Sequence, residues 1–579
     1  MLYNDPSTLA AVDALGRSLT TDTVIRPEKE RAVGLFYFLW CGEHGRHKPY
    51  DISKITAADP EAGYHTDSPA WGGVGTYHHW GEPFYGYYYS DDEWVIRRHM
   101  MLFCDAGVDF LFFDTTNHHT HADTALKIMK ILHELNEQGY NAPGVVFYTN
   151  TNAATMVKNL YNEIYAQNRY PDTWFCIDGK PVMIGPADAN INDFFTMKIN
   201  QWPTERENHV NAWPWMDGKR PQYIYKDNDG NRSAMNVSVA QHSSTWRFSD
   251  SIYDLMDRAN LGRSYGEAKL NEKLTEKYYD AIAADPELYK QGLNFQAQWD
   301  TVLNMTHEQR AADARFVFLT GWNEWVAEKL RAGDKNYYTC DTYCPEYSRD
   351  IEPSRSNGMK DYCYFMTIMN IHNDNFAPAV HYEYPAATPD ITKDDTAVWE
   401  TSKATYRDFT GECGDRNYKA MGGDTVYTDT TGRNDIDTVT VLRDSQYLYF
   451  RITCAEAITA HTEGDHGWMN LWLKTAGAEG DLMGGYEFVV NYEVSGSKSQ
   501  ILRCKSLTDM QSVGEADVNV YGKAMIIRIP LKALGLSENH YQVEFKVTDN
   551  VQNMIGDPLN LYSTGDAAPI GSLNFSFGY

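Results

Sequence analysis

The sequence predicts an α/β fold: a (β/α)8 TIM barrel over residues 1–384, a linker over 385–396 and an antiparallel β-sandwich over 397–579. Two patterns lead to this prediction. In the first part of the chain, apolar strand-like runs alternate with amphipathic helical segments, as parallel strands with crossover helices do. After the Pro- and Asp-rich stretch PAATPDITKDDTA, few helical segments are predicted. Short strand-like runs of alternating apolar and polar residues follow, separated by turn residues.

The barrel prediction depends on a set of short apolar runs and the helices between them. The first helix begins at the capping box of Ser90 and Glu93, and Gly107 is placed to end it. An open doubly wound sheet is the alternative, but no Gly-rich phosphate loop follows the first strand. The expected strand units are 33–40, 108–113, 144–150, the hairpin 174–185 with its turn at Asp178-Gly179, 210–216, 235–241, 293–300 and 316–322.

Charge and composition narrow the class of partner. The chain has 79 acidic and 51 basic residues, a net charge of -28, which disfavours binding to nucleic acids and to anionic membrane surfaces. No apolar run reaches the roughly 20 residues of a membrane span. Aromatic residues make up 13% of the chain, which suits either sugar binding or a large core. A carbohydrate is therefore the expected partner. The sequence does not determine the oligomeric state. The compartment also stays open: the protein is either cytoplasmic or exported with its signal peptide removed.

The active site of such a barrel lies at the carboxyl-terminal ends of its strands. The residues expected there suit sugar chemistry, because aromatic rings stack on pyranoses, amides bind hydroxyl groups and paired carboxylates cleave glycosidic bonds. The substrate-binding candidates are His79, Trp80, Glu82, Asn117, His118, Asn150, Trp213, Gln241, His242, Gln298, Trp299, Trp322, Asn323 and Trp325.

Glu324 is the first catalytic candidate, because it directly follows an apolar strand and lies between two Trp residues in W-N-E-W. Desolvation by the indoles would raise the pKa of this carboxyl and suit a general acid. A cap for a following helix, or an ion pair with an arginine, is the structural alternative. The second carboxyl is expected from Glu328 or, failing that, from Asp114, Asp300 or Glu82. Glu328 shares a face with Glu324 if the segment is helical, and Asp114 has the alternative of binding loop amides.

No metal or other cofactor is expected. The histidine groups His78-His79 and His118-His119-x-His121 lack the spacings typical of zinc sites. Asp424, Asp435 and Asp437 could contribute to a calcium site, but no loop of the EF-hand type supports one. A metal-dependent hydrolase is thus a minor alternative.

Several segments resemble family 99 glycoside hydrolases and the related family 71-like proteins. These are VGLFYFLW, YYSDDEWVIRRHMMLFCDAGVDFLFFD, the hairpin I-D-G-K-P-V, and FVFLTGWNEWVAEKL followed by EYSRDIEPS. The resemblance covers roughly residues 30–375. It implies a (β/α)8 retaining endo-glycosidase of α-mannosides, in which the first of two glutamates assists attack by the sugar's own 2-hydroxyl. Glu324 matches the first glutamate of the family motif N-E-W-x-E, whereas Glu328 lies one residue too far along.

The C-terminal region resembles family 9-like carbohydrate-binding modules, through VTVLRDSQYLYFRIT and a following strand with Trp468 and Trp472. A sandwich that binds no sugar is the alternative. Together these features predict a glycoside hydrolase with a carboxylate mechanism, retaining by the resemblance. The alternatives are a glycan-binding protein on an inactive barrel and a protein of polysaccharide assembly.

Overall fold

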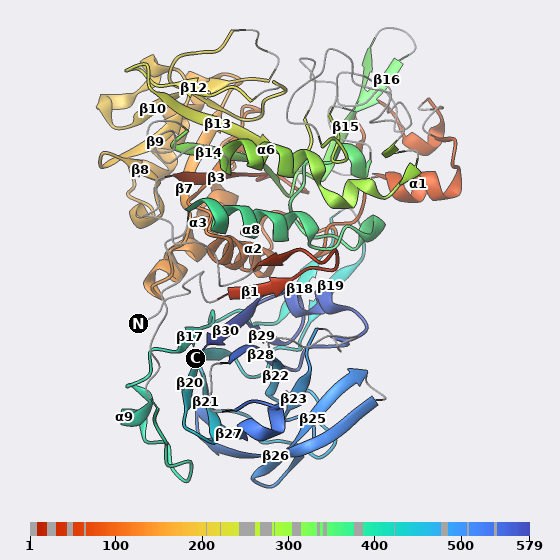
Figure 1. Cartoon of the computed structure of the whole chain (residues 1–579). Coiled ribbons are helices and arrows are strands. Elements are labelled where there is room, and N and C mark those ends of the chain that lie inside the picture. Colours follow the sequence, from red (N-terminus) through yellow and green to blue (C-terminus); the bar gives the residue numbers. More distant parts are fainter. Residues whose placement is uncertain are drawn as a thin grey trace. The chain divides into compact units, whose positions relative to one another are not determined.

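The computed structural model divides into two compact units (Figure 1). The barrel unit comprises Pro27–Phe376 with Tyr418–Tyr427, and the β-rich unit comprises Met1–Arg26, Ala377–Asn417 and Thr428–Tyr579. The structure describes the chain except for residues 1–8, 20–30, 43–49, 63–64, 66, 204, 206, 220–221, 242–260, 267–280, 283, 304–313, 333–335, 340–343, 376–385, 422, 476–484, 507–508, 538–540 and 579.

A nearly closed, barrel-like parallel sheet forms the centre of the barrel unit. Its last strand pairs with its first, and the described residues leave a break in the ladder only between β11 and β13. The side chain of Asn236 crosses that break by donating to the Trp215 carbonyl at 3.2 Å. The parallel strands are β3 (Ala32–Tyr37), β6 (Phe110–Thr115), β7 (Gly144–Thr149), β9 (Lys180–Ile184), β10 (Thr196–Gln201), β11 (Ala212–Pro214), β13 (Arg232–Ser238) and β14 (Phe316–Trp322).

Helices connect several of these strands as the sequence predicts. The helix α2 ends at Gly107 as predicted, with a φ of 75°. Its cap is Asp92, whose side chain accepts from the Trp94 amide, so the predicted capping box of Ser90 and Glu93 is wrong; Ser90 accepts instead from the Cys41 amide. In the connections from β9 to β10 and from β10 to β11, the described residues form no α-helix. The α-helices among the described residues of this unit are α1 (Ile52–Ala58), α2 (Glu93–Ala106), α3 (Ala122–Glu137), α4 (Ala153–Leu160), α6 (Leu293–Leu303) and α8 (Tyr362–Asn375).

Among the parallel strands of the barrel-like sheet, one predicted strand is wrong and one strand was missed. Residues 293–300 alternate apolar and polar side chains, but they form α6, with Phe295, Trp299 and Val302 buried at helical spacing. The missed strand is β10, whose sequence TMKINQ has too few apolar residues to predict one. The hairpin at Asp178-Gly179 is confirmed, with β8 (Cys176–Ile177) antiparallel to β9.

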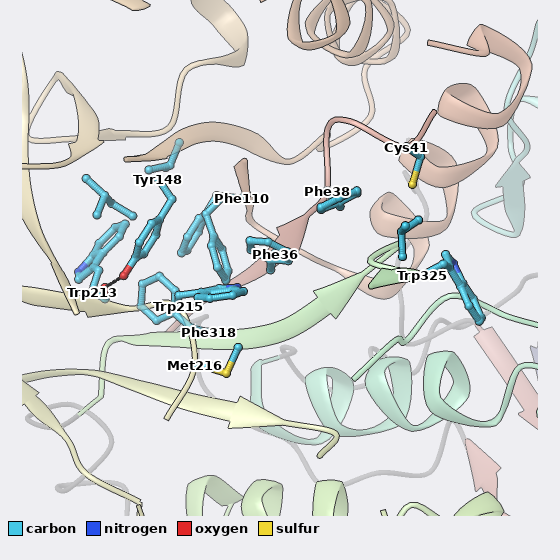
Figure 2. Packing of buried hydrophobic residues seen from close by; sticks show 14 of the residues in the cluster. Phe36, Phe38, Cys41, Phe110, Tyr148, Trp213, Trp215, Met216, Phe318 and Trp325 are labelled. Carbon is cyan, nitrogen blue, oxygen red and sulfur yellow. Dashed lines mark hydrogen bonds between the residues drawn. The ribbon is translucent and has the colours of Figure 1, made fainter. Parts of the chain in front are cut away.

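Alternate residues of the strands fill the interior of the sheet with aromatic rings (Figure 2). Phe110 stacks on Trp213 with ring centroids 5.4 Å apart, and Phe36 lies 5.5 Å from Trp215. Burying each large apolar side chain contributes about 1.5–3 kcal/mol, so this packing fixes the frame on which the strand ends are held.

A second, four-stranded sheet continues from the end of β14. It contains β4 (Tyr50–Asp51), β5 (Tyr77–His79), β15 (Val326–Ala332) and β16 (Asn336–Thr339). The segment after W-N-E-W is therefore a strand, and the helical arrangement considered for Glu324 and Glu328 is wrong.

The β-rich unit is built on a large antiparallel sheet. Its N-terminal strands β1 (Leu9–Val12) and β2 (Ser18–Leu19) extend this sheet, since β1 pairs with β30. The first residues of the chain thus belong to this unit, although they were expected in the barrel. Trp468 and Trp472 are buried here and offer no exposed platform. The further strands are β17 (Thr405–Arg407), β20 (Ile436–Arg443), β21 (Tyr447–Cys454), β22 (Asn470–Thr475), β23 (Phe488–Val490), β24 (Val494–Ser495), β25 (Lys498–Ser506), β26 (Asp509–Tyr521), β27 (Ala524–Pro530), β28 (Gln542–Asp549), β29 (Asp566–Ala568) and β30 (Asn574–Gly578).

Two smaller elements complete the fold. The strands β18 (Arg416–Lys419) and β19 (Val426–Asp429) form a two-stranded sheet. Among the described residues, no helix is both long and apolar enough to span a bilayer.

Candidate functional site

Glu324 lies at the carboxyl-terminal edge of the barrel-like sheet, between β14 and β15. The β14 ladder shifts register between Leu319 and Trp322, and such a bulge redirects the side chains that follow it. The Glu324 side chain is 16% exposed, and its Oε2 forms an ion pair with Arg349 Nη2 at 2.9 Å. An ion pair of this kind favours the ionised carboxylate. The alternative of an arginine partner is therefore confirmed, whereas desolvation of Glu324 by the two indoles stays a prediction.

Arg349 is itself built into the strand end. Its carbonyl accepts from the Gly321 amide at 2.9 Å, so its backbone runs beside β14. Its guanidinium lies 5.4 Å from the Trp215 ring centre and contacts Met216 Sδ at 3.4 Å. The Glu324 carboxylate and the aromatic end of β11 are thereby joined through one buried cation.

The other residues of W-N-E-W are buried and connect the end of β14 to neighbouring parts of the barrel unit. Asn323, fully buried, accepts from the Phe38 amide at 2.8 Å and donates to the Phe38 carbonyl at 3.1 Å, which joins the ends of β14 and β3. Trp322 packs edge-on against Phe103 at 4.7 Å, and Trp325 donates to a Glu352 carboxylate oxygen at 2.6 Å.

Asp114 lies at the end of β6 on the same strand face as the interior rings of Phe110 and Phe112. Its carboxylate accepts from the Trp40 indole at 2.8 Å and from the Thr116 hydroxyl and amide at 2.7 and 3.0 Å. Because β3 separates β6 from β14, the ends of the two strands lie about 9.6 Å apart, twice the usual spacing of about 4.8 Å.

Amide and aromatic groups occupy neighbouring strand ends. Asn150, half-buried after β7, accepts from the Asn200 amide at 2.9 Å. Trp202, half-buried after β10, packs on Trp215 with ring centroids 4.6 Å apart. Groups of these two types can bind hydroxyl groups and stack on rings.

Asp217 is a carboxyl that the sequence did not suggest. It follows β11 in the segment WPWMDGK, and its Oδ2 accepts from the Tyr225 hydroxyl at 2.8 Å. Its amide donates to Asn236 Oδ1 at 3.3 Å. Burial raises the pKa of Asp217 above its ordinary value, despite opposition from Lys219 and Tyr225. Its signal in the sequence is only its place one residue after the aromatic run W-P-W-M.

The other two catalytic candidates lie elsewhere. Asp300 is exposed on α6 and accepts from Gln296 at 2.8 Å, so its predicted place at a strand end is wrong. Glu328 is on β15, opposite Tyr77 of β5. β15 belongs to the four-stranded sheet, whereas Glu324 lies directly after β14 of the barrel-like sheet. Burial raises the pKa of Glu328.

The long connection after β3 contains two further candidates, Trp80 and His79, and both are buried. Trp80 stacks on Trp325 with ring centroids 4.7 Å apart, and a small hollow beside this pair is lined in part by Arg263, Asp350 and Glu352. His79 lies in β5 with both ring nitrogens buried and without a hydrogen-bond partner. Burial lowers its pKa to about 3.

The remaining candidates divide into exposed and buried residues. Asn117 and His118 are exposed in the turn after β6, and Glu82 is exposed in the long loop. Four others are buried in the core at 2% exposure or less and are not available to a ligand: Trp213, Gln241, Gln298 and Trp299. His242 lies outside the described residues.

The comparisons with known proteins give only distant structural likenesses. No protein-family model and no curated protein matches the sequence. A solved structure described as a glycoside hydrolase-like protein is 12% identical, with a TM-score of 0.31 over 62% of this chain and 98% of its own. The GH99 endo-alpha-mannosidase from Bacteriodes thetaiotaomicron is 11% identical, with a TM-score of 0.31 over 60% of this chain and 97% of its own. At these values the structural likeness does not establish a function, and the case for one depends on the side chains of the site.

Proposed function

We propose that this chain is a glycoside hydrolase and that its active site is the carboxyl-terminal edge of the barrel-like sheet. The observation that carries the proposal is the half-buried Glu324 carboxylate, held by Arg349 beside the Trp215 ring. A fixed anion next to an aromatic wall is suited to an oxocarbenium-like transition state, because the anion stabilises the positive charge that develops on the sugar.

Asp217 is the second carboxyl in this proposal. The two carboxyls have opposite environments, since a cation stabilises the charged form of Glu324 whereas burial favours the protonated form of Asp217. Pairs of this kind divide acid and base roles between them. Asp217 therefore donates a proton to the leaving oxygen, and Asp114 with the Trp40 indole binds the sugar.

The stereochemical outcome reports the separation of the reacting carboxyls. Retaining enzymes hold them about 5–5.5 Å apart and inverting enzymes about 6.5–9.5 Å apart. Strands two places apart, as β11 and β14 are across β13, favour the wider separation, whereas the resemblance implied retention. Proton NMR of the first product formed from an active substrate distinguishes the two outcomes.

A panel of α- and β-linked aryl glycosides and oligosaccharides tests the proposal. We expect wild-type turnover on at least one member and a loss of about 10²–10⁴-fold in kcat/KM for Glu324→Gln. Glu328→Gln is the matched control, because it removes a carboxyl outside the site and should retain the wild-type rate. Wild-type activity in Glu324→Gln would remove this residue from catalysis.

Binding without turnover is the second candidate function. The Arg349–Glu324 pair favours it, because a carboxylate committed to an ion pair can serve as a fixed acceptor for sugar hydroxyls. Calorimetric binding of a glycan that wild type never hydrolyses would establish this function and contradict the hydrolase.

A further inference from the structure

The carboxylate of Glu352 is buried beside the W-N-E-W segment. Its side chain has no exposed surface, and its Oε2 accepts from the Trp325 indole at 2.6 Å and from the Tyr88 hydroxyl at 2.8 Å. Its other oxygen, Oε1, lies 3.1 Å from His99 Nε2. Groups from the segment between β14 and β15, from the long connection after β3 and from α2 thus converge on one carboxylate.

The imidazole of His99 extends this network to the first parallel strand and to the other end of W-N-E-W. Its Nδ1 lies 2.9 Å from the hydroxyl of Tyr37, the last residue of β3. Burial, followed by the charge of Glu352, raises the pKa of Tyr37 well above its ordinary value, so this hydroxyl keeps its proton. The His99 ring also packs edge-on against Trp322, with ring centroids 5.3 Å apart. Both tryptophans of W-N-E-W therefore contact this network.

The segment that carries Glu352 also carries two partners of Glu324. Arg349 Nη2 forms an ion pair with the Glu324 carboxylate at 2.9 Å, and Asp350 Oδ1 accepts from the Glu324 amide at 3.0 Å. The Gly321 amide of β14 donates to the Arg349 carbonyl at 2.9 Å. A displacement of this short segment would therefore displace the Glu324 carboxylate.

We propose that Glu352 is a positioning residue, which fixes the segment from Arg349 to Glu352 against W-N-E-W and so holds the Glu324 carboxylate in one geometry. Hydrogen bonds to a charged acceptor are roughly twice as strong as neutral ones, and this carboxylate serves three neighbouring side chains. A displacement of about 1 Å in an active site can lower a rate by about 100-fold, so a buried carboxylate that touches no sugar can still control turnover. The effect on turnover rests on the proposed hydrolase, in which Glu324 is catalytic.

The test compares Glu352→Gln and Tyr88→Phe with the wild type, always as the full chain. The glutamine amide has no charge, and the Trp325 indole can only donate, so the amide either loses that bond or turns its nitrogen toward His99. Tyr88→Phe removes a single hydroxyl group and replaces Glu352→Gln if that variant does not fold. Asp109→Asn is the matched control, because its carboxylate accepts from a β3 amide at 2.7 Å, at the opposite, amino-terminal edge of the sheet.

The first measurement needs no substrate. A double-mutant cycle over Arg349→Met and Glu324→Gln gives the coupling between these two side chains from urea unfolding. We expect this coupling to fall by at least half in the Glu352→Gln background and to keep its wild-type size in the Asp109→Asn background. A carboxylate that only stabilises the core would lower the stability of every chain in the cycle equally and leave the coupling unchanged.

The second measurement is the turnover of the most active glycoside of the panel. Glu352→Gln should lower kcat by about 10–100-fold and change KM by less than about twofold, because Glu352 positions the carboxylate and does not bind the sugar. Tyr88→Phe, which removes one hydrogen bond, should lower kcat by about 2–10-fold. Asp109→Asn should keep the wild-type value.

Either of two results would overturn the proposal: a coupling between Arg349 and Glu324 that is unchanged in the Glu352→Gln background, or an active Glu352→Gln chain with the wild-type kcat. The same two results apply to Tyr88→Phe where it replaces Glu352→Gln. A wild type that cleaves no glycoside, with a coupling that still falls in the variant, would contradict the proposed hydrolase and support Glu352 as the residue that holds the ion pair.

Discussion

Breaking the pair between Arg349 and Glu324 should destabilise the barrel unit strongly. The two side chains are 3% and 16% exposed, and their charged atoms lie 2.9 Å apart. Removing one partner of a buried pair costs about 3–5 kcal/mol, because the remaining charge is left without compensation. Since Glu324 keeps some contact with water, we expect about 3 kcal/mol for Arg349→Met and about 1.5 kcal/mol for Glu324→Gln, whose amide oxygen still accepts from Arg349.

A double-mutant cycle isolates the interaction from the packing that Arg349 also makes. The coupling free energy between the two residues should be about 1.5–3 kcal/mol. The exposed pair Lys130–Glu93, 3.7 Å apart with side chains 48% and 50% exposed, is the control and should give about 0.2–1 kcal/mol.

Urea unfolding of the full chain measures the cycle, followed by tryptophan fluorescence and circular dichroism. Because the chain has two units, the barrel transition is fitted separately from that of the β-rich unit. A coupling energy no larger than that of the Lys130–Glu93 control would refute the inference that Arg349 holds Glu324 in place.

Three further predictions concern the frame and the pH dependence. Asn323→Ala should lower the free energy of unfolding in urea by about 2–3 kcal/mol, because it leaves the buried amide and carbonyl of Phe38 unpaired. A decrease below about 1 kcal/mol would contradict the inference that Asn323 joins the ends of β14 and β3. Burial lowers the pKa of His79 to about 3 and that of His78 to about 4, below the value of 6.5 in an unfolded chain. Their contribution to the stability of the folded state is therefore complete above pH 6.5 and is lost as the pH falls toward 4 and 3. His79→Phe should therefore weaken the loss of stability between pH 7 and 5, and an unchanged slope would contradict this. Activity that requires the Asp217 proton should fall as pH rises through its raised pKa, and Asp217→Asn should abolish that alkaline limb along with most of kcat; a variant that keeps the wild-type profile would exclude Asp217 as the acid.

The sequence predicted the parts of the barrel that depend on local pattern. Buried parallel strands read as continuous apolar runs, which is why β3, β6, β7 and β14 were found. The strand β10 was missed because its neighbours β9 and β11, and not its own residues, place TMKINQ in the sheet. Pairing of β1 with β30 joins opposite ends of the chain, and no local pattern reports such a contact.

The place of the proposed site at the strand ends could be inferred from the sequence, whereas its contacts could not. The position of Glu324 after an apolar strand was visible, whereas its partner Arg349 lies in a separate segment that returns along β14. The same reason explains why Asp217 was missed and why four buried residues were expected at the mouth. A side chain at a strand end faces either the mouth or the core, and packing over the whole barrel decides which.

A crystal structure of Glu324→Gln soaked with the most active glycan of the panel tests the central claim most directly. The proposal predicts a sugar ring beside Trp40 and the Trp202–Trp215 pair, with the bond to be cleaved about 3 Å from the side chain at position 324. A glycan bound away from this edge of the sheet, or a side chain at 324 turned from the sugar, would contradict the assignment of the active site.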